Sequence, residues 1–150
     1  MSTVSSILYC TDLNNFKLDA LLQAVSWSKR LNASLQTLLG MDIDDMERVF
    51  SSYQYRPLSK SLDKRQQSSL TEIKEVVDAY ITGAGDAELQ SVALLERKSL
   101  HEIYRQLRNK NCDLLIIDSY RDNTMLEATF KKQLIASSPV TVIVLPDQFR

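Results

Sequence analysis

The sequence has little glycine: three residues in 150, at Gly40, Gly83 and Gly85. None lies between two apolar runs, 114–117 and 140–145, that read as buried parallel strands. The turn after such a strand is where α/β folds bring backbone amides against a phosphate, and that close approach needs glycine. Here residues 118–124 carry bulky side chains and two carboxylates. The sequence therefore predicts a nucleotide-type α/β scaffold without a phosphate-binding loop.

Residues that do chemistry are also scarce. Two cysteines, Cys10 and Cys112, make neither a disulfide framework nor a metal quartet, and we expect both to be small buried thiols. The single histidine, His101, falls beside the apolar stripe of its expected helix, so it should face solvent. No Gly-x-Ser-x-Gly motif is present. We expect no catalytic residue, no metal site and no cofactor, and therefore no enzyme.

The sequence has no excess of positive or negative charge and no long apolar stretch. The chain has 18 basic and 19 acidic residues, which gives no long-range field for nucleic acid or an anionic membrane. Short basic runs such as Lys131-Lys132 are expected to be solvated helix faces. No apolar stretch approaches the roughly 18 residues that cross a bilayer, and the N-terminus lacks a signal-peptide pattern. We expect one cytoplasmic domain over residues 1–150, with no nucleic-acid or membrane partner.

Periodicity predicts strands that alternate with helices. The expected strands cover residues 6–12, 35–42, 89–95, 113–118 and 139–145. The first expected helix begins at Asn14 or Asn15 and ends at Asn32, and a short second helix lies within 43–58. The third runs to residue 82, either from about residue 59 or from a capping box at Ser69. The last two cover 100–109 and 125–137. The residues expected to face inward from the last helix are Leu126, Phe130, Gln133 and Leu134. This alternation predicts an α/β fold with a parallel sheet and helices on both faces.

Three stretches carry a resemblance to a known family. They are a first strand ending in Asp12 and followed by Ala24 to Leu35, the run Asp113 to Ile117, and the run Pro139 to Pro146. In order and spacing the chain resembles the universal stress proteins over nearly all of its length. The resemblance implies a three-layer sandwich with a five-stranded parallel sheet in the order 3-2-1-4-5. It also implies a role in the stress response and dimers made through the last strand.

The chain departs from the nucleotide-binding members of that family. They carry Gly-x2-Gly-x9-Gly-Ser/Thr after the fourth strand, whereas Leu126 and Glu127 stand here in place of the final pair. In nucleotide-binding relatives the residue that matches Asp12 contacts the base or ribose region; the alternative here is a role in capping the first helix or binding loop amides. The vestigial ligand cleft should comprise the residues at the strand ends: Asp12, Asp42, Asp118, Ser119 and Arg121.

The last strand is apolar on both faces and has no charged residue to protect an edge. An unpaired strand of this kind promotes aggregation, so we expect it to pair with the same strand of a second copy. The interface residues would be Val140, Thr141, Val142, Ile143 and Val144. Cover by the tail 147–150 or by a helix is the alternative.

Two functions fit the sequence. The first is a homodimeric stress-response module that acts through protein partners and does not depend on ATP. The second is a protein that binds an adenine nucleotide or another small ligand without glycines, with Arg97, Lys98 and Arg121 offsetting the carboxylates. A tightly bound nucleotide would favour the second.

Overall fold

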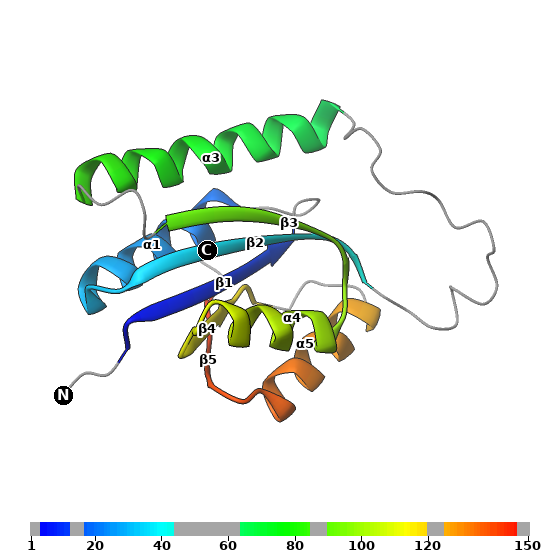
Figure 1. Cartoon of the computed structure of the whole chain (residues 1–150). Helices are drawn as coiled ribbons and strands as arrows, with labels where there is room; N and C mark the ends of the chain where they lie inside the picture. The colour runs from blue at the N-terminus through cyan, green and yellow to red at the C-terminus, as the bar shows by residue number, and fades with distance from the viewer. Residues whose placement is uncertain (1–3, 13–16, 44–63, 85–89, 120–124, 147–150) are drawn as a thin grey trace.

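The computed structural model describes residues 4–12, 17–43, 64–84, 90–119 and 125–146, which form a parallel sheet with helices on both sides (Figure 1). The strand order is β3-β2-β1-β4-β5, and every neighbouring pair is parallel. The strands are β1 (Ser6–Asp12), β2 (Ser34–Ile43), β3 (Gln90–Lys98), β4 (Leu114–Ile117) and β5 (Thr141–Val144). The helices are α1 (Leu18–Leu31), α3 (Lys64–Ala84), α4 (Leu100–Asn109) and α5 (Met125–Ser137). The predicted α/β class with a parallel sheet is confirmed.

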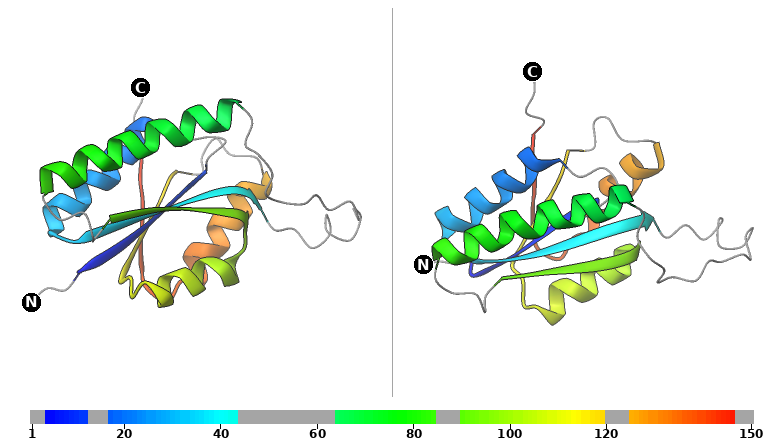
Figure 2. Two further views of the ribbon diagram at one scale, coloured as in Figure 1. Left: turned by 45° about the horizontal axis from the view of Figure 1, so that its top comes forward. Right: turned by 90° about the horizontal axis from the view of Figure 1, so that it is seen from above.

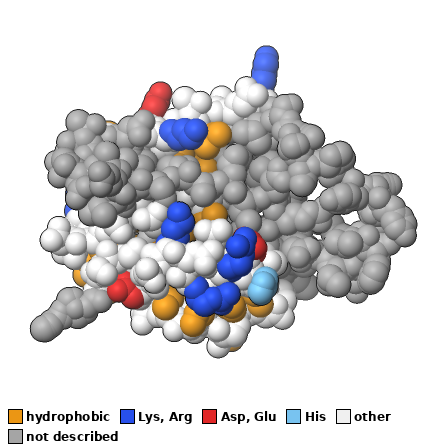
Figure 3. Space-filling view, viewed as in Figure 1, with side chains coloured by type: hydrophobic (Ala, Val, Ile, Leu, Met, Phe, Trp, Pro, Cys, Tyr) orange, Lys and Arg blue, Asp and Glu red, His pale blue; other side chains and the backbone are white. Residues whose placement is uncertain are grey.

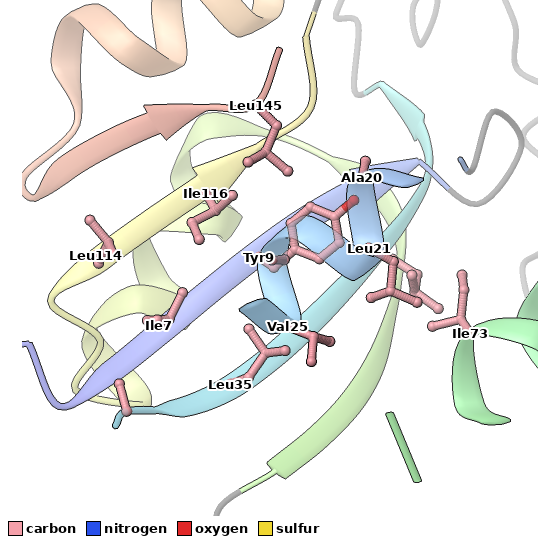
Figure 4. Close-up of a cluster of buried hydrophobic side chains, with 13 residues drawn as sticks. Ile7, Tyr9, Ala20, Leu21, Val25, Leu35, Ile73, Leu114, Ile116 and Leu145 are labelled. Carbon is pink, nitrogen blue, oxygen red and sulfur yellow. The ribbon is translucent and has the colours of Figure 1, made fainter. Parts of the chain in front are cut away.

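Alternation along the strands creates two apolar cores. Ile7 and Tyr9 of β1 point to the face covered by α1 and α3, whereas Leu8 and Cys10 point to the face covered by α4 and α5. Figure 2 shows the two helix layers on opposite sides of the sheet. Figure 4 shows the α1 and α3 side, where Tyr9 lies among aliphatic side chains. A strand buried on both faces is the reason that β1 has no polar-apolar alternation.

The first helix differs from the prediction at its beginning and matches it at its end. Lys17 is the N-cap residue and its side chain makes no capping hydrogen bond, so the expectation of a cap at Asn14 or Asn15 was wrong. Asn32 ends the helix in the left-handed region, with a φ of 56°. Asparagine tolerates this conformation better than most residues, so it can replace the usual glycine.

Other boundaries follow local chemistry. Ser99 caps α4 by accepting a hydrogen bond of 3.1 Å from the backbone amide of Glu102. β5 is shorter than predicted because a local turn precedes it, in which the Ser138 hydroxyl bonds both the amide and the carbonyl of Val140. α3 begins at Lys64, between the two predicted starts. The short helix expected within 43–58 lies outside the described residues.

Candidate functional site

The candidate site lies where β1 and β4 end at the carboxyl edge of the sheet. Parallel strands bring their ends to one edge, and ligands of open α/β sheets bind there. Asp12 ends β1 and Asp118 follows β4. Both are buried, with 7% and 8% of their surfaces exposed. Strand alternation sends them to opposite faces: Asp118 toward α1 and α3, and Asp12 toward α4 and α5.

Asp118 is held by two hydroxyl groups of β1. The Tyr9 hydroxyl donates to Oδ1 at 2.6 Å, and the Thr11 hydroxyl donates to Oδ2 at 2.5 Å. Tyr9 is fully buried, and burial, followed by the negative charge of Asp118, raises the pKa of its phenol well above the ordinary value of 10.0. The phenol therefore remains a donor at neutral pH. Both carboxylate oxygens of Asp118 thus accept hydrogen bonds inside the protein.

A small cavity lies on the other face, beside Asp12. Its volume is about 20 Å³, which is room for one water molecule. It is lined by residues of β1, β4, α4 and α5: Cys10, Thr11, Asp12, Ile103, Ile117, Phe130, Lys131 and Leu134. Among the described residues, the cavity lies between Asp12 of β1 and Lys131 and Phe130 of α5.

Lys131 is a residue that sequence reasoning missed. It is only 9% exposed, and its Nζ lies 3.5 Å from the carbonyl oxygen of Ser119, to which it donates. The expectation of a solvated Lys131-Lys132 face was wrong for Lys131 and right for Lys132, which is exposed. The expectation that Gln133 faces inward was also wrong, because Gln133 is exposed while Phe130 and Leu134 are buried.

The spacing of α5 contained a signal for this arrangement. Position 131 is three residues before Leu134 and directly follows Phe130, so it belongs to the buried stripe by geometry. The expectation that Lys131 is exposed to solvent rested only on its charge. A lysine can be buried when its ammonium group reaches a backbone carbonyl at the end of a strand.

The structure brings three of the five predicted cleft residues together. Asp12, Asp118 and the half-buried Ser119 lie at the ends of adjacent strands. Asp42 lies in β2 two residues beyond Gly40, which pairs with Asp12, and its backbone pairs with Arg97; its side chain is outside the description. Arg121 lies outside the described residues. Because Asp12 and Asp118 point to opposite faces of the sheet, these residues share an edge, and the ligand cleft stays a prediction.

The histidine and the two cysteines show no arrangement for catalysis or metal binding among the described residues. His101 is exposed on α4, where its pale-blue side chain lies at the surface (Figure 3). Cys10 and Cys112 are free and buried, and burial raises the pKa of the Cys112 thiol, which disfavours the reactive thiolate. Within the described ranges, no group of three or more histidine, cysteine or acidic side chains is placed to hold a metal ion. None of the described helices is long and apolar enough to span a membrane.

No family model and no curated protein matches the sequence. The similarities to known proteins therefore come from comparison of the fold with solved structures. A universal stress protein family member from Burkholderia pseudomallei superimposes with a TM-score of 0.59 at 17% identity, over 96% of this chain and 97% of that one. A universal stress protein in complex with cAMP superimposes with a TM-score of 0.62 at 14% identity, over 96% of this chain and 98% of that one. The universal stress protein UspA from Lactobacillus plantarum superimposes with a TM-score of 0.58 at 16% identity, over 97% of this chain and 100% of that one. This chain has the universal stress protein fold.

Within the universal stress protein fold, β5 forms one edge of the sheet and pairs only with β4 among the described strands. Thr141 and Val144 are exposed, Val144 by 38%, while Val142 and Ile143 are half-buried. No charged residue occurs from Ser138 to Pro146. The predicted interface residues, Val140 to Val144, therefore lie at an apolar edge, and their pairing with a second copy stays a prediction.

Proposed function

We propose that this chain is a divergent universal stress protein that acts as a homodimeric module in the cytoplasmic stress response. It works through protein partners, has no enzymatic reaction and does not use ATP. The observation that supports this proposal best is at the carboxyl edge, where the Asp118 carboxylate accepts hydrogen bonds from Tyr9 and Thr11. Within the described part of this edge, the residue that follows β4 is thus an internally bonded acid and not a donor that could hold a phosphate.

Charge argues in the same direction. A triphosphate needs several N–H donors or a cation to offset its charge, and the glycines that would expose backbone amides are missing after Gly85. Two buried carboxylates, Asp12 and Asp118, flank the place where such a ligand would sit. Like charges in a desolvated site repel strongly. Lys131 offers one cation, but its ammonium group already donates to the Ser119 carbonyl.

The apolar edge strand β5 supports the proposed homodimer. An exposed strand with unpaired backbone groups and no charged or proline residue within it is a site for strand addition. β5 meets this description over Thr141–Val144. A two-fold axis would let the same edge serve both partners and would cover Val144.

Nucleotide content of the purified protein tests the ATP-independent function. The protein is isolated gently, unfolded, and its small molecules are identified by mass spectrometry. The proposal predicts no nucleotide in amounts comparable with the protein. The cAMP-bound relative, treated in the same way with added cAMP, is the positive control. Stoichiometric ATP or AMP released from this chain would contradict the proposal.

A second function is favoured by one observation: Asp12 borders a cavity at the carboxyl edge, and a protein of the same fold holds cAMP. In this alternative the chain binds an adenine nucleotide or another small ligand through side chains in place of glycine. Asp12→Asn would then change the affinity for the nucleotide found, whereas the exposed Asp19→Asn on α1 would not. Equal affinity of both variants and the parent protein would argue against this use of Asp12.

A further inference from the structure

One side of α1 runs beside the apolar edge of the sheet. The Gln23 side-chain amide reaches the Pro146 carbonyl, which lies just beyond β5, at 3.5 Å. Figure 2 shows α1 next to the end of β5. The hydrogen bond therefore identifies which side of the helix faces the edge strand.

Trp27 extends this side by one turn. It lies four residues after Gln23, so the two side chains share a stripe on the helix. Trp27 is half-buried and packs on the core that also receives Ile143 of β5. The Arg30 guanidinium lies 5.8 Å from the centre of the indole ring and is itself exposed. A large aromatic side chain, partly uncovered, thus lies on the side of α1 whose Gln23 bonds the segment after β5.

The direction of α1 brings this stripe along β5. The helix starts at the carboxyl edge and returns to the amino edge, where Asn32 ends it and the amide of Ser34 bonds the carbonyl of Ser5. It is therefore antiparallel to β5. Moving from Gln23 to Trp27 advances about 6 Å from Pro146 toward the Thr141 end of the strand.

The symmetry of a strand-to-strand dimer determines what would meet this stripe. Two copies of β5 that pair in antiparallel fashion across an axis perpendicular to the sheet keep the same face up in both copies. Residues that face each other across the two strands must then point to the same face of the sheet. This requires the axis to pass through one residue and its own copy, such as Val142 or Ile143. In either case every side chain of β5 is paired with an uncharged side chain. The α1 layers of the two copies adjoin on one face of the joined sheet.

We propose that Trp27 and its stripe on α1 form part of the homodimer interface and are covered by the second copy of this chain. This inference rests on the proposed β5 dimer and adds a helical contact to it. Tryptophan is enriched at protein interfaces and among the residues that contribute most binding energy there. The second copy is the occupant because β5 offers it an uncharged, self-complementary edge that continues into Trp27.

The single tryptophan makes the test direct. Sedimentation equilibrium measures the dimer dissociation constant, and tryptophan emission with acrylamide quenching is recorded over the same dilution series. We expect a red shift and stronger quenching as the dimer dissociates. Trp27→Ala should weaken dimerisation at least about tenfold. Trp27→Phe, which keeps much of the apolar contact, should have a smaller effect.

Leu22 supplies the matched control. It is 48% exposed on α1 but points away from the Gln23 and Trp27 stripe. Leu22→Ala should therefore change the dissociation constant by less than about twofold. The inference would be wrong if Trp27→Ala left the dissociation constant unchanged and if the tryptophan emission of the parent protein did not change as the dimer dissociates. That result would not contradict the β5 dimer itself. A chain that stays monomeric at every concentration would overturn both.

Discussion

Hydroxyl groups replace water around the buried carboxyl group of Asp118. Tyr9 and Thr11 reach it from two successive positions on one face of β1, where alternate residues point the same way. A buried acceptor without a hydrogen-bond donor costs about 1 to 3 kcal/mol. Loss of either hydroxyl should therefore lower the free energy of unfolding of the whole protein. These contacts give the end of β4 a structural role at the carboxyl edge, where open α/β sheets bind their ligands.

Tyr9→Phe and Thr11→Val should each lower the free energy of unfolding by about 1 to 3 kcal/mol at pH 7. The two variants should differ at high pH. The folded protein holds the Tyr9 proton more tightly than the unfolded chain does, so this group's stabilisation is present at neutral pH and declines as pH rises above 10.0. The deficit of Tyr9→Phe should therefore shrink above that pH, whereas the Thr11→Val deficit stays constant. Urea denaturation between pH 7 and 11 measures both, and a Tyr9→Phe deficit that does not change with pH would contradict the account.

Lys131 and Lys132 are adjacent lysines with opposite environments. Lys131→Met removes a buried ammonium group that donates to Ser119, and should lower stability by about 1 to 3 kcal/mol. Lys132→Met alters an exposed side chain and should change stability by less than about 0.5 kcal/mol. Chemical denaturation of both variants gives the comparison. Equal effects would show that Lys131 does not secure the segment after β4.

At the scale of elements, helix caps and strand edges explain where segments begin and end. Ser99 accepts from the Glu102 amide and starts α4. Ser99→Ala should cost about 1 kcal/mol of stability, because an N-terminal amide of the helix loses its partner. Ser99→Asp should retain most of that stability. Thermal or chemical unfolding of the two variants measures the difference, and an alanine variant as stable as the aspartate variant would refute the capping role.

The sequence predicted the elements that have strong periodicity and left the site's details open. The Ile103 and Leu107 stripe of α4 and the continuous apolar run of β4 were found because burial there is dictated by apolar side chains alone. The inward turn of Asp118 and the burial of Lys131 were not found. Each depends on a partner more than ten residues away, Tyr9 or Ser119, and such contacts leave no local pattern.

At the scale of the whole molecule, the proposed function uses the two edges of the sheet differently. At the carboxyl edge, the Asp118 carboxylate accepts hydrogen bonds from Tyr9 and Thr11 on one face, and Lys131 lines a small cavity with Asp12 on the other. At the lateral edge, β5 contains no charged residue and pairs only with β4 among the described strands. The account therefore assigns partner recognition to the second edge and no ATP to the first.

Titration of the purified protein with MgATP by isothermal calorimetry tests this central claim most directly. The account predicts no saturable binding tighter than roughly 1 mM, which corresponds to about −4 kcal/mol. The cAMP-bound relative titrated with cAMP verifies the assay. A saturable one-to-one MgATP complex in the micromolar range would contradict the account.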